Sequence, residues 1–124
     1  GIKNLIEATR NNTGMVFAFA INYGGRDEIK RAVENIADDV ESGKISKCDI
    51  SEELISSYLD TKDLPDPDLL IRTSGELRVS NFLLWQIAYS EFYITDTLWP
   101  DFDKEELLKA IESYSHRQMR FGCR

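Results

Sequence analysis

Residues 68–86 read DLLIRTSGELRVSNFLLWQ, and this stretch decides the fold class. Its apolar start, LLIRT, predicts a buried strand that stops at Arg72. The SGELR that follows predicts a tight turn and carries a second arginine, Arg78. The apolar run after the turn predicts a helix over about 80–89, so that a strand is followed directly by a helix.

Strands and helices alternate in the same way along the rest of the chain. MVFAFAIN at 15–22 is a near-continuous apolar run, which predicts a strand buried on both faces, and EFYIT at 91–95 predicts a third strand. Further helices are predicted over the run that begins at Ile2, over the apolar stripe of Ile29, Ala32, Val33, Ile36, Ala37 and Val40, over Ser51–Tyr58, and from Asp103, which with Glu106 forms a capping-box-like start. This order predicts an α/β fold with a parallel sheet flanked by helices.

Three parallel strands make a small sheet with two open edges. We therefore expect either that more strands lie upstream or that another chain covers these edges. The sequence begins at Gly1 without a methionine, and we expect a trimmed or partial chain. Without an internal repeat or a linker, residues 1–124 are predicted to be part of one domain, and an incomplete one.

The composition is that of an ordinary globular protein, with 42% hydrophobic and 30% charged residues. A formal net charge of −7 argues against nucleic-acid binding, which needs a basic face, but it does not exclude a small anionic ligand. Cys48 and Cys123 have no partner at metal or redox spacing, which indicates free thiols in a reducing compartment. We expect a cytoplasmic location, and the sequence leaves a plastid open as the alternative. No stretch has the length of a transmembrane helix.

Two arginines and a hydroxyl are the main candidate ligand-binding groups. Arg72 ends a predicted strand, at the carboxyl edge where open α/β sheets bind ligands. Arg78 follows six residues later, and Ser80 is the predicted N-cap of the next helix. Forked donors and a helix N-terminus suit a phosphate or diphosphate. The alternative is that the arginines only form structural ion pairs with Glu76 or Asp68.

The other candidates have structural alternatives that the sequence leaves open. Glu91 lies among apolar neighbours and is either an edge carboxylate or a Mg²⁺ ligand or acid–base group. His116 has no evident catalytic partner and is predicted to be a surface residue. The aromatic residues are either core or the wall of an apolar cavity; they are Trp85, Phe92, Tyr93 and Trp99.

Longer segments of the sequence resemble a known family. PDPDLLIRTSGELRVSNFLLWQIAYSEFYITDTLWPDF, NTGMVFAFAINYGGRDEI and RQMRFG closely resemble segments of the cis-prenyltransferases, the undecaprenyl diphosphate synthase family, from about Asn12 to Gly122. The resemblance implies a larger, mostly parallel sheet with flanking helices and a homodimer. It also implies condensation of isopentenyl diphosphate with an allylic diphosphate such as farnesyl diphosphate, with cis double bonds and Mg²⁺, to give polyprenyl diphosphate.

The resemblance also implies roles for individual residues. Arg72, Arg78 and Ser80 match the family's isopentenyl diphosphate-binding positions, and Val79 lies on the same substrate loop. Glu91 matches a carboxylate assigned to the Mg²⁺ environment. The RxG ending, which in this family reaches the partner subunit's diphosphate site, is matched by Arg120, Phe121 and Gly122.

Two parts of the family pattern are missing. The Asp-Gly-Asn-Gly-Arg-Trp motif and the segment with the catalytic asparagine are absent, so that no catalytic residue is assigned to this chain and we expect the C-terminal half of an enzyme. Leu77 stands where some members have histidine, and Cys123 where glycine is frequent. The alternatives are a non-catalytic regulatory subunit of a heteromeric cis-prenyltransferase and an unrelated phosphate-binding module. Membrane association is expected only through the lipid product or a missing segment.

Overall fold

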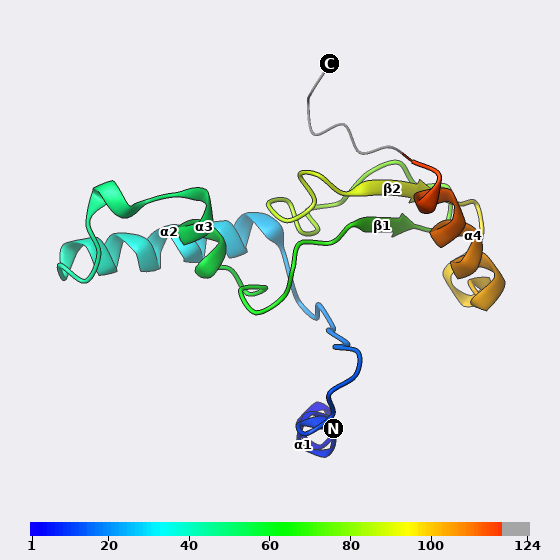
Figure 1. The fold of residues 1–124 in the computed structure, drawn as a ribbon, viewed down its shortest axis with the longest axis horizontal. Coiled ribbons are helices and arrows are strands. Elements are labelled where there is room, and N and C mark those ends of the chain that lie inside the picture. Colours follow the sequence, from blue (N-terminus) through cyan, green and yellow to red (C-terminus); the bar gives the residue numbers. More distant parts are fainter. Residues whose placement is uncertain (118–124) are drawn as a thin grey trace.

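The computed structural model describes residues 1–117. They form an α/β fold with a parallel sheet and flanking helices, as the sequence predicted. The helices are α1 (Ile2–Thr9), α2 (Gly25–Glu41), α3 (Glu52–Ser57) and α4 (Lys104–Ser115), the strands are β1 (Leu69–Arg72) and β2 (Glu91–Ile94), and short 3₁₀ turns occupy Lys47–Asp49 and Trp99–Asp101. In Figure 1, α2 and α3 lie at one end of the molecule, the sheet lies in the middle, and α4 lies at the other end.

The sheet consists of β1 and β2 paired in parallel. Leu69 is opposite Glu91 and Arg72 is opposite Ile94, so the carboxyl ends of both strands lie at the same edge. The predicted boundaries of both strands are therefore confirmed to within one residue. The helix α4 packs against β2, and α3 packs against α2.

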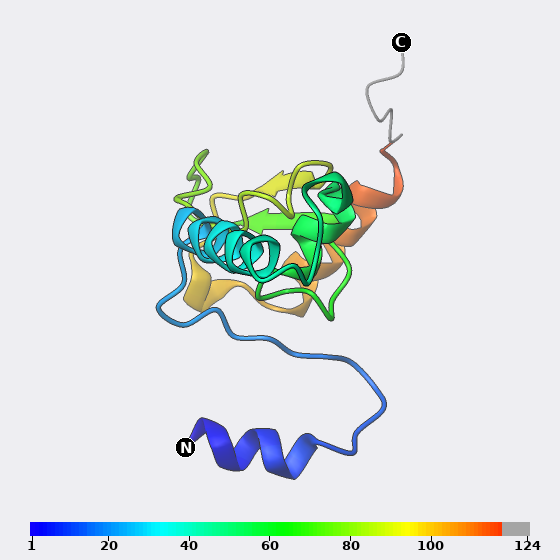
Figure 2. The same cartoon turned by 90° about the vertical axis from the view of Figure 1, so that its left-hand side faces the viewer.

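The strand predicted at 15–22 is wrong, because the structure of residues 1–117 has no strand there. The segment is unpaired and leads away from the sheet to α1, which stands apart from the rest of the molecule (Figures 1 and 2). Met15, Phe17 and Ile21 are 87%, 69% and 65% exposed. An apolar run forms a strand only when a neighbouring strand takes up its backbone hydrogen bonds, and residues 1–117 provide no such neighbour.

The helix predicted over 80–89 is also wrong, because this segment is a series of turns. Ser80, Asn81 and Leu83 have φ angles of 48°, 65° and 46°, in the left-handed region. A right-handed helix requires φ near −60°, so no helix can begin at Ser80. The prediction that Ser80 is an N-cap is therefore wrong as well.

The helices α3 and α4 begin at the predicted caps, but the Glu106 carboxylate accepts the Thr97 hydroxyl at 3.1 Å and does not complete the predicted capping box. Ser51 Oγ accepts the backbone N–H of Leu54 at 3.1 Å at the start of α3. Asp103 Oδ1 accepts the N–H groups of Glu105 and Glu106 at 2.9 and 3.0 Å at the start of α4. These acceptors satisfy N–H groups that have no partner within the helix.

The apolar core is small. The fully buried apolar side chains among residues 1–117 are Ala32, Ile36, Leu59 and Ala110. Val33 and Ala37, which the helical stripe placed in the core, are exposed, as are Ile2, Leu5 and Ile6 of α1. Sheets and helices are stable when they bury an apolar face, and much of the apolar surface here has no cover within the described residues. The fold is therefore an incomplete α/β domain.

Candidate functional site

Arg72 lies at the carboxyl end of β1, where the sequence predicted it. Its carbonyl accepts the N–H of Thr95 at 3.0 Å, which ties the strand end to the chain after β2. The partly buried side chain borders a hollow of about 550 Å³, whose other lining residues include Trp99, Phe102 and Leu107. Arg72 Nε is buried and has no hydrogen-bond partner among residues 1–117. A buried unpaired N–H is costly, and it marks a donor that an anion would satisfy.

The turn after β1 is held against the loop after β2. Ser74 N–H donates to Thr97 O and Gly75 N–H donates to Thr95 O, both at 2.9 Å. Gly75 has φ = 66°, and a Cβ there would lie 2.7 Å from Asp96 Oδ1. The positive φ therefore favours glycine at this position, and any side chain there would also have to displace the Asp96 carboxylate.

Arg78 forms a salt bridge with the Glu76 carboxylate at 2.5 Å, so the structural pairing that the sequence left open is observed for this arginine. Its side chain is 69% exposed. Exposed ion pairs contribute roughly 0 to 1 kcal/mol, so an anionic ligand could displace Glu76 at little cost. For Arg72 the described residues contain no such ion pair with Asp68.

Ser80 and Val79 complete the predicted substrate segment. Ser80 is exposed, and Val79 is partly buried with its carbonyl accepting the N–H of Phe82 at 3.0 Å. Neither Arg78 nor Ser80 lines the hollow beside Arg72. The predicted diphosphate-binding residues therefore lie within residues 72–80, but in the described structure they do not line the same cavity.

Glu91 is the first residue of β2 and pairs with Leu69 at the amino end of the sheet. At about 3.3 Å per strand residue, this position is roughly 10 Å from the level of Arg72. The Glu91 carboxylate accepts Arg117 Nη1 at 2.9 Å, and the same nitrogen donates to Phe92 O at 2.9 Å. Glu91 is therefore an edge carboxylate in an ion pair in this structure.

The described residues do not fit a complete Mg²⁺ site. Within residues 1–117, no group of three or more acidic, histidine or cysteine side chains could hold a metal ion. Glu91 would supply one carboxylate at most, and hard cations require several oxygen ligands. Arg120 and Gly122 of the predicted substrate site lie outside the described residues.

The aromatic candidates do not share one cavity. Trp85 Nε1 donates to Ser56 Oγ at 3.0 Å and lines a different hollow, next to α3. Trp99 is 72% exposed and stacks on Phe102 with a ring-centroid distance of 6.0 Å. His116 is exposed at the end of α4, as predicted, and Cys48 is a free, exposed thiol.

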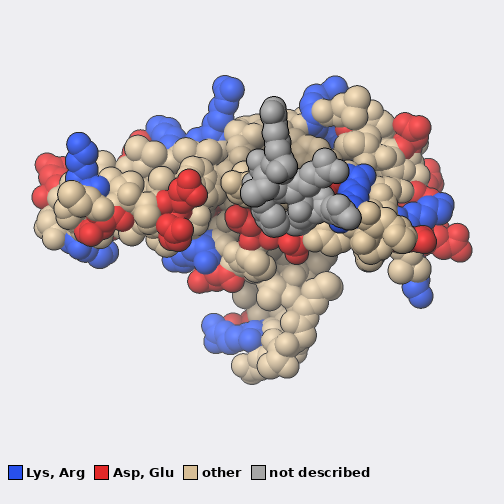
Figure 3. Space-filling view, turned by 45° about the horizontal axis from the view of Figure 1, so that its top comes forward, with Lys and Arg blue, Asp and Glu red and all other residues tan. Residues whose placement is uncertain are grey.

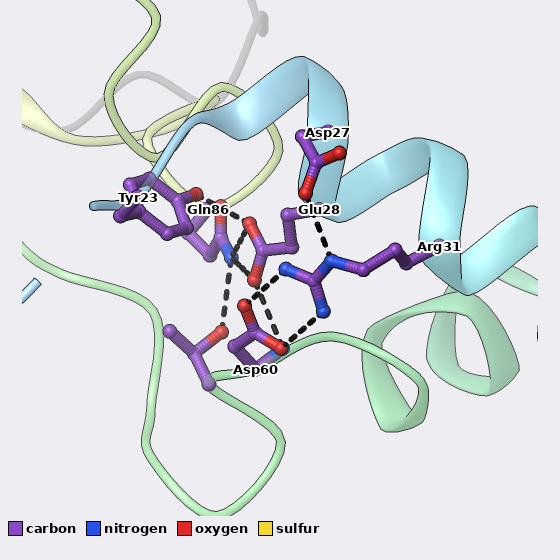
Figure 4. A network of polar contacts seen from close by, with 7 residues as sticks. Tyr23, Asp27, Glu28, Arg31, Asp60 and Gln86 are labelled. Atoms are coloured by element: carbon purple, nitrogen blue, oxygen red, sulfur yellow. Dashed lines mark hydrogen bonds and ion pairs between the residues drawn. The ribbon is translucent and has the colours of Figure 1, made fainter. Parts of the chain in front are cut away.

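A buried polar network on α2 was not found from the sequence (Figure 4). Glu28 is 1% exposed, and its carboxylate accepts the Tyr23 hydroxyl, the backbone N–H of Asp60 at 2.9 Å and Gln86 Nε2 at 3.1 Å. Gln86 Nε2 also donates to Thr61 Oγ1 at 3.0 Å. The network joins α2 to the loop after α3 and to the 80–90 segment. The missed signal is that Glu28 lies at helical spacing from two core residues, Ala32 and Ile36.

Charges on the visible surface are mixed. Figure 3 shows Lys and Arg side chains interspersed with Asp and Glu over this face, without a continuous basic area. None of the helices described is long and apolar enough to cross a membrane.

The ion pair at the edge of the network leads to a pH-dependent prediction. Arg31 Nη1 and Nη2 donate to the Asp60 carboxylate at 2.9 and 2.6 Å, and these bonds hold the pKa of Asp60 below its ordinary value of 3.8. A carboxylate with a lowered pKa in the folded state stabilises the fold above its unfolded pKa, and this contribution is lost as the pH falls through the folded pKa. We therefore expect Asp60→Asn to destabilise the protein by less than about 1 kcal/mol near neutral pH, since the pair is about half exposed.

The difference between the wild type and Asp60→Asn should vanish once the pH is below the lowered pKa of Asp60. Urea unfolding of both proteins across the acidic range measures it, with Asp63→Asn as the matched surface control. A difference that persisted unchanged at the acidic end would contradict the role of this ion pair.

Comparisons with known proteins identify relatives over nearly the whole chain. The family model of undecaprenyl diphosphate synthase matches residues 1–122. Curated relatives named isoprenyl transferase include those of Bacillus anthracis, 59% identical, and Streptococcus pyogenes serotype M3, 62% identical, each over 121 residues. These matches cover 98% and 94% of this chain but 47% and 49% of the relatives. The chain thus spans about half the length of the curated relatives it matches.

Solved structures agree with the sequence matches. Lavandulyl diphosphate synthase from Lavandula x intermedia, in complex with dimethylallyl diphosphate, superposes with a TM-score of 0.94 at 43% identity, covering 98% of this chain and 52% of that protein. A probable undecaprenyl diphosphate synthase from Campylobacter jejuni superposes with a TM-score of 0.81 at 36% identity, covering 98% of this chain and 54% of that protein.

Proposed function

The chain belongs to the undecaprenyl diphosphate synthase family of prenyltransferases, and from this premise we propose that it takes part in cis-prenyl transfer. The substrates of this reaction are isopentenyl diphosphate and an allylic diphosphate such as farnesyl diphosphate. The relatives that match it are named isoprenyl transferase, and one solved relative holds dimethylallyl diphosphate, an allylic diphosphate. The product of the proposed reaction is a polyprenyl diphosphate.

One observation carries the proposal: a guanidinium N–H at the carboxyl end of β1 is buried and unpaired within the described residues. Arg72 Nε has the chemistry and the location for a diphosphate oxygen. Arg78, which is exposed and ion-paired with Glu76, would add a second forked set of N–H donors, and Ser80 would add a hydroxyl. Val79 joins these two residues in the same substrate segment.

The proposed role of these residues is to bind and orient isopentenyl diphosphate. In the reaction, the allylic diphosphate loses its diphosphate, the double bond of isopentenyl diphosphate forms a bond to the allylic carbon, and a proton is lost to give a new double bond. The nucleophile, isopentenyl diphosphate, would be held by its diphosphate through Arg72, Arg78 and Ser80. Its double bond would then lie next to the allylic carbon, so that the two substrates react as if within one molecule. No group for the proton transfer is assigned to residues 1–124.

Mg²⁺ and a second subunit are part of the proposal. Bound Mg²⁺ would stabilise charge on the leaving diphosphate. Glu91 would be its one ligand from this chain, once released from Arg117, and the remaining ligands would come from outside residues 1–117. In the proposed homodimer, Arg120 and Gly122 would contribute to the substrate site of the partner subunit. We propose a cytoplasmic location for this reaction.

The test is prenyl transfer by the protein expressed from its native reading frame. With farnesyl diphosphate, Mg²⁺ and labelled isopentenyl diphosphate, we expect label in long-chain polyprenyl diphosphate at a turnover of roughly 1 per second, within the common range for enzymes. Omission of the allylic diphosphate is the control. A protein that binds isopentenyl diphosphate but elongates nothing would refute the catalytic proposal and favour a regulatory subunit.

A further inference from the structure

The helix α2 is capped by a residue from a distant part of the chain. Its first N–H groups have no acceptor in the helix, and Gly24, at the N-cap position, offers no side chain. Gly25 N–H donates to Asn81 O at 2.7 Å, and Arg26 N–H donates to Asn81 Oδ1 at 2.9 Å. Asn81 therefore accepts two of the unpaired N–H groups at the helix start, one with its backbone carbonyl oxygen and one with its side-chain oxygen.

The two glycines at the start of α2 allow this close approach. A Cβ at Gly25 would lie 2.9 Å from Leu84 Cγ and 3.0 Å from Asn81 O. A Cβ at Gly24 would lie 2.9 Å from Asn81 Nδ2. These distances are shorter than normal van der Waals contacts, so the backbone of the 80–84 segment rests directly on the backbone of the helix start.

The same segment has an unfavourable backbone conformation. Ser80, Asn81 and Leu83 all have positive φ, and each such residue costs of order 1 kcal/mol or more, although asparagine tolerates it best. Such a conformation persists only when its surroundings hold it. The two hydrogen bonds to α2 are the contacts that hold Asn81 in place.

A second connection to α2 follows five residues later. Gln86 is 3% exposed, and its Nε2 donates to both oxygens of Glu28 at 3.1 Å. Figure 4 shows Gln86 directed at Glu28 from the neighbouring segment. Residues 81–86 are therefore fixed to α2 at both ends, and the proposed diphosphate-binding residues Arg78 and Ser80 lie immediately before this fixed segment.

We propose that Asn81 is a positioning residue for isopentenyl diphosphate. By capping α2, it fixes the left-handed turn at Ser80 and so the approach of Ser80 and Arg78 to the diphosphate. The inference rests on the proposed prenyl-transfer function. It adds a residue that touches no substrate itself and acts through its neighbours, and it links the substrate segment to the buried network around Glu28.

Two substitutions at Asn81 distinguish its role as the cap of α2 from its role in the left-handed backbone conformation. Asn81→Gly keeps the left-handed conformation available but removes the Oδ1 acceptor. Asn81→Asp keeps an acceptor, and its charge is favourable at a helix N-terminus. Asn12→Gly, at an exposed position after α1, is the matched control. All are compared with the wild type in the protein expressed from its native reading frame.

Asn81→Gly is expected to raise the KM for isopentenyl diphosphate about tenfold, as for the loss of one hydrogen bond, and to change the KM for the allylic diphosphate less than about twofold. Asn81→Asp should stay within about twofold of the wild type in both constants. A merely structural role would change both Michaelis constants alike or only the melting temperature. Either result, or equal losses for Gly and Asp at residue 81, would overturn the proposal.

Two further measurements keep the test decisive. If Asn81→Gly does not fold, Gly25→Ala replaces it, because the added Cβ displaces the 81–84 segment, Asn81 and Leu84 included, without changing its sequence. The KM for isopentenyl diphosphate must then again rise while the KM for the allylic diphosphate stays nearly constant. If the wild type itself neither binds isopentenyl diphosphate nor transfers prenyl groups, the proposed function has failed and the positioning role fails with it. Amide exchange at Arg26, whose N–H donates to the Asn81 side chain, would still show whether Asn81 caps α2, since it should accelerate in Asn81→Gly and not in Asn81→Asp.

Discussion

Residues 1–124 alone are expected to form no detectable polyprenyl diphosphate under conditions in which a full-length relative is active. Three features of the described residues account for this: the sheet has two strands, the apolar segment 15–21 is uncovered, and no cluster of metal-binding side chains is present. The chain also spans about half of its curated relatives. Positioning and electrostatic stabilisation both fail when groups around the reacting atoms are absent.

Activity is expected to return when the missing half is supplied in trans. The measurement is product formation after residues 1–124 are mixed with the separately expressed other half of the Bacillus anthracis isoprenyl transferase. The control is Phe17→Asp, which places a charge in the exposed apolar segment and should prevent the restoration because a buried unpaired charge is costly. Robust synthesis by residues 1–124 alone would disprove the expectation.

Arg72→Ala is expected to lower kcat/KM for isopentenyl diphosphate by roughly 10- to 100-fold in the protein expressed from its native reading frame. A hydrogen bond to a charged group contributes about 1.5–3 kcal/mol, which corresponds to this range. The effect should appear mainly in the KM for isopentenyl diphosphate. The KM for the allylic diphosphate should change less, because Arg72 is proposed to hold the other substrate.

Steady-state kinetics with each substrate varied in turn measure this difference. Arg72→Lys should lie between the wild type and Arg72→Ala, since lysine keeps the charge but loses the fork and the buried Nε–H. Arg10→Ala removes an arginine that forms only an exposed ion pair with Glu7 on α1, and it is the matched control. Equal effects of Arg72→Ala on the two Michaelis constants would count against the assignment.

The parts of the fold that depend on local sequence could be predicted. The existence of α2, though not the burial of its whole stripe, and the caps at Ser51 and Asp103 depend on residues within one or two turns. The apolar runs at β1 and β2 are typical of buried parallel strands. The segment 15–22 has the same kind of run, yet it is unpaired. A strand is defined by its neighbour, and the sequence of the run does not say whether a neighbour is present.

The 80–89 segment shows a second limit. Its apolar pattern favours a helix, but the left-handed backbone at Asn81 is stabilised by a helix start 55 residues away in the sequence. For the site, the sequence located Arg72 at the end of a strand, and the resemblance supplied its proposed ligand. Glu28 lies at helical spacing from two core residues, but nothing in the local sequence pairs it with a glutamine 58 residues away, so the buried pair was missed. The roles of all the proposed site residues stay predictions; these are Arg72, Arg78, Val79, Ser80, Glu91, Arg120 and Gly122.

The uncovered segment also affects how the chain behaves at high concentration. Residues 15–21, MVFAFAI, form a seven-residue run without charge or proline and with high β-propensity, and their backbone is available for pairing. Such runs template cross-β stacking between identical chains. The unpaired backbone that would let this segment accept a neighbouring strand also makes it prone to aggregation. Co-expression with a partner that pairs with the segment would therefore keep the chain soluble.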